Sequence, residues 1–191
     1  MRQGMQTRSM PAEFRAEETD GRRVIEGYFA VFDAVYSPYG DWEETIAPGA
    51  FAGETGGDVR ALINHDTTLV LGRVPAGTLT LHEDGRGLWG RIEINGEDQD
   101  AVNAWARVKR RDVTQCSFGF DILDEEKQVD GETGRVRFVI RRVKLYEVSV
   151  VTFPAYEDTG VEARSAQAAR ERERALEAWK TRMRRRIAHG A

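Results

Sequence analysis

The segment Gln115–Phe120 places a serine beside a small residue on the polar side of a predicted strand. Side chains alternate along a strand, so Ser117 shares one face with Gly119, where a foreign chain could come close. The other face is apolar and can enter a core: Cys116, Phe118, Phe120 and Ile122. An accessible hydroxyl on a rigid strand is what nucleophilic catalysis by serine requires, so Ser117 is the candidate nucleophile.

A histidine at the end of a hydrophobic strand is the candidate general base. His65 follows the apolar alternation of residues 58–64, and a pKa near neutrality suits an imidazole for taking the proton of a serine. The simpler interpretation is a surface-loop histidine bonded to the neighbouring Asp66. His82 precedes a tight turn and His189 lies near the chain end, so we expect no catalytic role for either.

Glu147 lies in the segment 145–153, which is apolar on both faces and therefore reads as a buried strand. A buried carboxylate is costly without a partner, and a histidine that it orients would be one, as in a catalytic triad. The alternative is an ion pair with a nearby base: Arg141, Arg142 or Lys144. Ser149 shares the face of Glu147, but its bulky neighbours leave little room for a substrate, so we rank it below Ser117.

Cys116 is the competing nucleophile, because a histidine–cysteine hydrolase is chemically feasible. It falls on the phenylalanine face, where a thiol acts as a small hydrophobic group, so we rank it well below Ser117. As the single cysteine it cannot form an internal disulfide, which fits a reducing compartment. The three histidines are scattered and suggest no zinc site, and nothing in the chain calls for a cofactor.

The length and composition are typical of a globular protein. The 191 residues suit one domain with appendages, and 40% hydrophobic with 31% charged residues describe an ordinary globular chain. No apolar run approaches the roughly 20 residues that span a bilayer, and residues 1–5 lack a signal core, so we expect neither a membrane partner nor export. We also expect no nucleic-acid partner.

Charge is unevenly distributed along the chain. Residues 166–191 hold eight Lys or Arg and three Asp or Glu, a net +5, so the total of −4 leaves −9 on the first 165 residues. A basic tail on an acidic body suggests docking on an acidic partner, and a solvated arginine-rich helix is the simpler alternative. The apolar residues of the tail form a narrow seam: Leu176, Trp179, Met183 and Ile187. Such a seam buries little surface alone, so it needs the body or a partner, and a second copy of the chain, in a homo-oligomer, is one such partner.

Hydrophobic alternation and turn residues predict many short strands and one or two helices, a mainly β (α+β) barrel or sandwich with helical decoration. We divide the chain into a leader with the first hairpin arm (1–21), a barrel domain (22–163) and a basic helical tail (164–191), with residues 1–11 loose. A hairpin turns at Asp20-Gly21, and residues 97–109 form the clearest helix of the body. Strands are expected at 12–18, 22–32, 58–64, 69–74, 79–82, 88–94, 113–123, 135–142 and 145–153. Residues 43–51 are expected to form a short strand followed by a turn that starts a brief helix.

Five segments in order resemble the prohead serine proteases of tailed phages, which mature the capsid. They extend over Val24 to Ala163: Gly27–Phe32, Pro48–Phe51, Asn64–Asp66 with Leu71–Arg73, Ser117–Phe120, and Leu145–Val151 with Pro154-Ala155. Each segment alone is weak, but five with compatible spacing are fairly specific. Cys116 departs from the pattern, since the family usually carries methionine or another apolar residue before the serine.

The resemblance implies a fold similar to the herpesvirus assemblins, a closed β-barrel surrounded by a few helices. It implies a His65–Ser117 pair with an acidic third member, which we place at Glu147. The expected substrates are scaffold protein or the scaffold-like segment of the major capsid protein, inside the assembling procapsid in the host cytoplasm. Family members also cleave themselves, and the tail would be a targeting segment that is later removed.

The expected reaction is peptide hydrolysis by acyl transfer, with backbone N–H groups near the serine strand, or Arg141 or Arg142, as candidate oxyanion donors. A hypothesis of another class is a non-enzymatic β-barrel that binds capsid or scaffold protein through the tail helix. The charge asymmetry and the apolar seam of the tail support it.

Overall fold

The computed structural model describes residues 5–37, 42–131, 133–153 and 158–188, with side chains of the last helix described from 165 to 182. The longer sheet has the order β1-β9-β10-β5-β6, and β4 also pairs with β10. Its strands are β1 (Gln6–Pro11), β4 (Trp42–Ile46), β5 (Arg60–Ile63), β6 (Asp66–Arg73), β9 (Gln115–Val129) and β10 (Val136–Val151).

The second sheet has the order β2-β3-β8-β7. Its strands are β2 (Arg15–Thr19), β3 (Arg22–Val31), β7 (Leu79–Glu83) and β8 (Gly87–Ile94). The β2–β3 hairpin turns at Asp20 and Gly21, and both residues have positive φ, as a two-residue type I′ loop requires. The helical elements are a short 3₁₀ turn, η1 (Val74–Ala76), and the helices α1 (Gln99–Arg110) and α2 (Asp158–Ala188).

The mainly β architecture with few helices is confirmed, but the expected closed barrel is wrong. The strands of the described residues form two separate hydrogen-bonded sheets, and both contribute buried side chains to one apolar cluster. The core side of β9 carries the buried Cys116, Phe118 and Phe120, which belong to the same cluster as the buried side chains of β3 and β8. Burial of apolar side chains between the two sheets, rather than a closed ring of hydrogen-bonded strands, therefore holds the sheets together.

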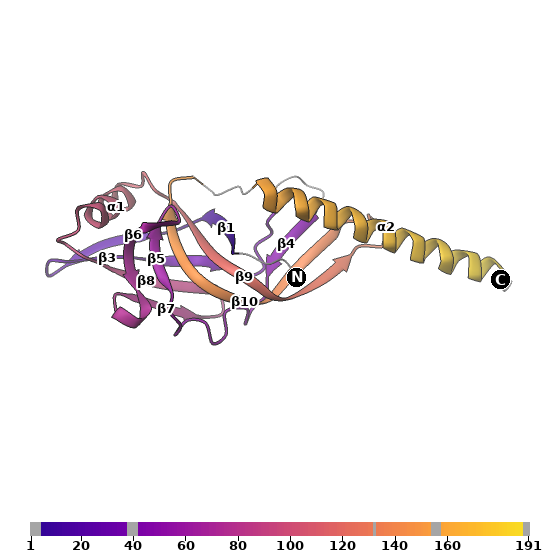
Figure 1. Ribbon diagram of the computed structural model, residues 1–191, viewed down its shortest axis with the longest axis horizontal. Helices are drawn as coiled ribbons and strands as arrows, with labels where there is room; N and C mark the ends of the chain where they lie inside the picture. Colours follow the sequence, from indigo (N-terminus) through magenta and orange to yellow (C-terminus); the bar gives the residue numbers. More distant parts are fainter. Residues whose placement is uncertain (1–4, 38–41, 132, 154–157, 189–191) are drawn as a thin grey trace.

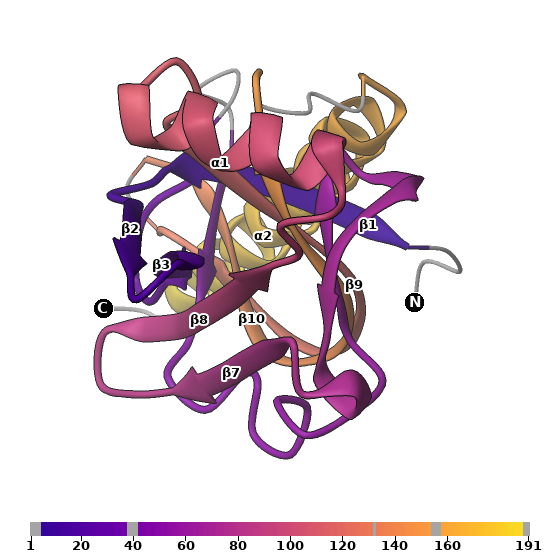
Figure 2. The same cartoon turned by 90° about the vertical axis from the view of Figure 1, so that its left-hand side faces the viewer.

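Helix α1 covers one end of the molecule with an apolar stripe of helical spacing, as the sequence predicts (Figure 2). The stripe consists of Ala101, Ala104, Trp105 and Val108. The Asp98 carboxylate caps its start by accepting hydrogen bonds from the backbone of Asp100 and Ala101. Helix α1 ends directly before the strand that carries Ser117.

Two features of the long sheet differ from expectation. Residues 135–142 and 145–153 form one continuous strand, β10, because β-bulges absorb the irregular stretch around Arg142 while pairing with β9 continues. Residues 6–11 of the expected loose leader form β1, which pairs with β9 from Gln115 to Phe120. The N-terminal segment therefore lies directly beside Ser117.

Helix α2 begins against the far end of the long sheet and then extends away from the body (Figure 1). Ala168 packs with Trp42, Val136 and Phe138, and the Trp42 indole donates to Ser165 Oγ at 3.1 Å. Leu176 and Trp179, the described part of the predicted seam, are about half exposed, at 50% and 51%. Met183 and Ile187 lie outside the described side chains. Within the described residues, no helix is long and apolar enough to cross a membrane.

Candidate active site

His65 is placed by a tight turn between two adjacent strands. Asn64 and His65 have φ of 52° and 61°, so both central residues of the β5–β6 connection are left-handed, as in a type I′ hairpin turn. This backbone is rare for residues other than glycine and occurs often at functional sites. The Asn64 side chain fixes the turn by accepting from Thr152 N at 2.8 Å. The sequence predicts the strand end but not this turn.

The structure brings His65 and Glu147 together, although 82 residues separate them in the chain. His65 Nδ1 lies 2.7 Å from Glu147 Oε1, and the exposed fractions of the two side chains are 17% and 5%. Strand β10 positions Glu147, and the parallel partner β5 leads directly into the His65 turn. A carboxylate in this position fixes the imidazole as the Nδ1–H tautomer and leaves Nε2 as the base. Asp66, the alternative partner of His65, instead accepts from Thr68.

Ser149 completes the support of the carboxylate. Its hydroxyl donates to Glu147 Oε2 at 2.5 Å, lies 3.5 Å from His65 Nδ1, and accepts the backbone N–H of His65 at 3.3 Å. Ser149 thus faces the ring nitrogen that Glu147 already holds. The other nitrogen, Nε2, is buried and has no hydrogen-bond partner among the described residues. Nε2 is therefore the ring nitrogen that is available to accept the proton of a nucleophile.

Ser117 lies on the same face, one strand away. It is the direct register partner of Ser149, as Gly119 is of Glu147. Residues directly opposite in an antiparallel pair have Cβ atoms about 4.5–5.5 Å apart, so Ser117 borders the His65–Glu147 pair. No hydrogen bond between His65 and Ser117 is present. The Ser117 hydroxyl instead donates to the backbone carbonyl of Arg8 at 3.0 Å.

The expectation that Ser117 is accessible is wrong, because its exposed fraction is 0%. Strand β1 covers it: Ser9 is its register partner on the side away from β10, and the Arg8 carbonyl holds its hydroxyl. Rotation about one Cα–Cβ bond would turn the hydroxyl away from Arg8. The sequence gives little indication of this cover, since residues 6–11 are mostly polar and end in proline.

Gly119 makes room for the Glu147 carboxylate rather than for a substrate, contrary to the prediction from the sequence. A Cβ atom at Gly119 would lie 3.1 Å from both Cγ and Cδ of Glu147, and closer still to Oε1. The carboxylate therefore folds over the Cα atom of Gly119, and only glycine lets Oε1 reach His65 from this register position.

The structure disfavours Cys116 as the nucleophile and Arg141 and Arg142 as oxyanion donors. Burial raises the pKa of the Cys116 thiol to about 12, and its Sγ lies within 3.4 Å of the carbonyls of Tyr28 and Phe29, so it is a core residue. Arg141 pairs with Glu126, and Arg142 is in register with Asp124. Both precede Ser149 by seven or eight residues of strand, more than about 20 Å of chain at 3.3 Å per residue. They are therefore unsuitable as oxyanion donors, and Glu147 pairs with neither.

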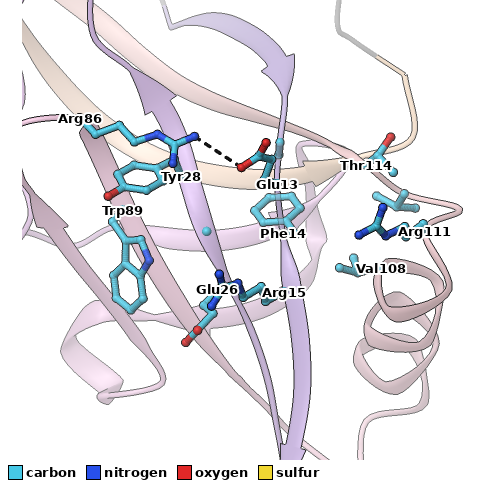
Figure 3. Close-up of a pocket in the computed structure, with 13 residues that line it drawn as sticks. Glu13, Phe14, Arg15, Glu26, Tyr28, Arg86, Trp89, Val108, Arg111 and Thr114 are labelled. Atoms are coloured by element: carbon cyan, nitrogen blue, oxygen red, sulfur yellow. Dashed lines mark ion pairs between the residues drawn. The ribbon is translucent and has the colours of Figure 1, made fainter.

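A separate cavity of about 550 Å³ opens between residues 12–15, β3, β8 and the end of α1 (Figure 3). Arg86 stacks on the Tyr28 ring at 4.5 Å and pairs with Glu13 across this cavity, while Arg111 lies on its far side. His65, Ser117 and Glu147 do not line it, so it is not the space in which the candidate nucleophile and base meet. Among the described residues there is also no group of three or more His, Cys, Asp or Glu side chains that could hold a metal ion.

Comparison with known proteins identifies the family of the chain. The "Prohead protease" of Enterobacteria phage HK97 is 31% identical over 165 residues, which cover 84% of this chain and 68% of that protein. The bacteriophage T4 capsid assembly protease has a similar fold, with a TM-score of 0.50 and 11% identity over 77% of this chain and 96% of that one. The model of the caudovirus prohead serine proteases matches residues 10–173. The chain is thus a serine protease and belongs to the caudovirus prohead serine protease family.

Proposed function

We propose that this chain matures phage capsids by cleaving scaffold protein, or the scaffold segment of the major capsid protein, inside the procapsid in the host cytoplasm. Ser117 is the nucleophile, His65 the general base and Glu147 the residue that orients the imidazole. The observation that carries this assignment is the 2.7 Å contact between His65 and Glu147 beside a serine on the adjacent strand. Membership of a serine protease family supports it and disfavours a purely non-enzymatic binding module.

In the proposed reaction, Ser117 Oγ bonds to the carbonyl carbon of the scissile peptide while its proton passes to His65 Nε2. Glu147 accepts from Nδ1–H and stabilises the imidazolium that forms. The tetrahedral intermediate then breaks its C–N bond, and the imidazolium gives its proton to the leaving amine. A water molecule, activated by the same imidazole, releases the acyl group from Ser117. Backbone N–H groups near the serine strand remain the candidate oxyanion donors.

Ser149 is the competing nucleophile, because its hydroxyl lies 3.5 Å from Nδ1 of the His65 ring. Its contact is with Nδ1, which Glu147 occupies, and its hydroxyl donates to the carboxylate. A serine that faces the occupied nitrogen supports the base but cannot give its proton to the free one. We therefore assign Ser149 to positioning of Glu147.

Intact-mass measurement tests the assignment of Ser117 over Ser149. Wild type, Ser117→Ala and Ser149→Ala are each expressed alone and with the scaffold and capsid proteins of the same phage. We expect wild type to cleave these substrates and to lose mass by self-cleavage. Ser117→Ala should abolish both at unchanged far-UV circular dichroism, and Ser149→Ala should retain them at about one tenth of the rate, the scale of losing one supporting hydrogen bond. Cleavage by Ser117→Ala would refute the assignment.

We further propose that α2 serves as the docking segment for the assembling capsid or for a second copy of the chain. The support is its net positive charge and the half-exposed Leu176 and Trp179 on a helix that extends away from the body (Figure 1). Replacing both with serine should remove incorporation into procapsids without changing peptide hydrolysis. Unchanged incorporation would leave the tail without this role.

A further inference from the structure

The strand that covers Ser117 occupies the place that a peptide substrate would take. Strand β1 ends the sheet, so without it β9 would present a free edge at Ser117. Extended peptides commonly bind by adding a strand to such an edge. Residues 6–11 do this along the whole stretch from Gln115 to Phe120. The chain itself therefore shows how an extended peptide fits beside the candidate nucleophile.

Arg8 takes the position of the residue that precedes a scissile bond. Its carbonyl oxygen is the one that meets the Ser117 hydroxyl, at 3.0 Å. Ser9, the next residue, is the register partner of Ser117. In a bound substrate the same placement would put the bond between these two positions at the nucleophile, and the side chain of the first position would determine which residue is accepted.

The Arg8 side chain enters a site built for a cation. Glu44, 2% exposed, accepts from Arg8 Nε at 2.5 Å and from Nη2 at 3.0 Å, a two-pronged contact that suits a planar guanidinium. The Arg8 guanidinium also lies 5.6 Å from the ring centres of Tyr36 and Phe120. A buried carboxylate without a positive partner is strongly unfavourable, so Glu44 calls for a basic side chain here.

An apolar cavity of about 240 Å³ adjoins this contact. Its walls combine β1, β4, the segment 31–36 and one core side chain of the serine strand, Phe118. Apolar walls leading to one carboxylate match the long aliphatic stems and charged ends of lysine and arginine. The family match begins at residue 10, so it includes Glu44 but not the Arg8 that fills the site.

Two buried polar side-chain atoms of strand β1 lack hydrogen bonds within the described part of the chain. Gln6 Nε2 and Thr7 Oγ1 are buried without a hydrogen-bond partner among the described residues. A strand with unpaired buried polar atoms is held less firmly than one whose groups are all bonded. Exchange of β1 for a substrate strand is consistent with this.

Resting on the proposed proteolytic function, we propose that Glu44 determines specificity, selecting peptides with arginine or lysine immediately before the cleaved bond, and that Arg8 of β1 occupies its site until a substrate displaces it. The pair predicts two opposite effects. Loss of the Glu44 charge removes the preference, whereas loss of the Arg8 charge removes an internal competitor.

The test uses the full chain and two peptides from a cleaved substrate, which differ only by arginine or citrulline at that position. Citrulline keeps the shape of arginine and lacks its charge. We expect wild type to favour the arginine peptide by about 100-fold in kcat/KM, the scale of losing one partner of a buried charge pair. Glu44→Gln should reduce this ratio to below about 5. Arg8→Gln should keep the ratio and lower KM for the arginine peptide.

The matched control is Glu126→Gln, which removes a carboxylate that pairs with Arg141 near the other end of β9. It should leave the ratio unchanged, and circular dichroism should show all variants folded. Equal cleavage of both peptides by wild type, or an unaltered preference in Glu44→Gln, would overturn the role of Glu44 and leave proteolysis at Ser117 intact. Cleavage of neither peptide nor of the parent substrate would instead overturn the proposed function, and this inference with it.

Discussion

Replacing Gly119 with alanine tests whether the catalytic geometry depends on a carboxylate folded over a glycine. A Cβ atom there would lie 3.1 Å from Cδ of Glu147 and about 1 Å inside van der Waals contact with Oε1. Oε1 is the atom that holds His65 Nδ1 at 2.7 Å. A withdrawal of about 1 Å along that bond would lengthen it beyond the roughly 3.5 Å at which a hydrogen bond ceases.

A misplacement of about 1 Å in a catalytic group can cost about 10²-fold in rate, equivalent to about 2.7 kcal/mol of activation free energy. We therefore expect Gly119→Ala to lower kcat about 100-fold and to leave KM nearly unchanged, since Gly119 lies behind the base rather than in the substrate path. The assay is steady-state hydrolysis of a peptide taken from a cleaved capsid or scaffold substrate.

Gly96→Ala is the matched control, because a Cβ atom at Gly96 meets nothing within 4 Å. It should retain wild-type kinetics. Thermal unfolding of both variants separates loss of the site from loss of the fold, and Gly119→Ala should still unfold cooperatively. Activity of Gly119→Ala within threefold of wild type would refute the argument that Glu147 must occupy the space above this glycine.

Two further predictions concern Glu147 and the buried thiol. Glu147→Gln, which keeps the shape but removes the charge that stabilises the imidazolium, should lower kcat by about 10³–10⁴-fold at pH 7, and a near-normal rate would reduce Glu147 to a structural residue. Cys116 should resist alkylation in the folded protein at pH 8. With a pKa of about 12, about one thiol in 10⁴ is ionised there, against about one in four for a free cysteine. Modification by iodoacetamide at the rate of a free thiol, in the absence of denaturant, would contradict this burial.

Local patterns were enough to predict much of the fold. The alternation around Phe118 and the helical spacing in 97–109 each have one strong interpretation, and the structure has a strand and a helix there. The turn at Asp20-Gly21 is equally local. The pattern predicted a barrel or a sandwich but did not decide between them, because whether sheets close depends on hydrogen bonds between strands distant in sequence, which periodicity does not specify. The closed barrel implied by the family resemblance was wrong.

The residue types of the candidate site and its contact between His65 and Glu147 were predictable, but its other contacts were not. A carboxylate in a strand apolar on both faces requires a partner, and this argument indicated that Glu147 and His65 belong together. The cover over Ser117 was missed because its hydroxyl bonds a backbone carbonyl of Arg8, and any residue type supplies such a group. The support from Ser149 was missed because its bulky neighbours were weighed only as obstacles to a substrate.

The buried face of β9 fixes the geometry of the face that carries the proposed catalytic residues. Ser117 and Glu147 are brought together by a register in which Ser117 opposes Ser149 and Gly119 opposes Glu147. A slip of one residue would turn Ser117 into the core and Phe118 out of it, because strand side chains alternate strictly. The stacked Phe118 and Phe120 rings, 4.8 Å apart and both buried, make that slip costly. Substitutions of these phenylalanines should therefore impair catalysis through the register of β9, although neither ring faces the histidine.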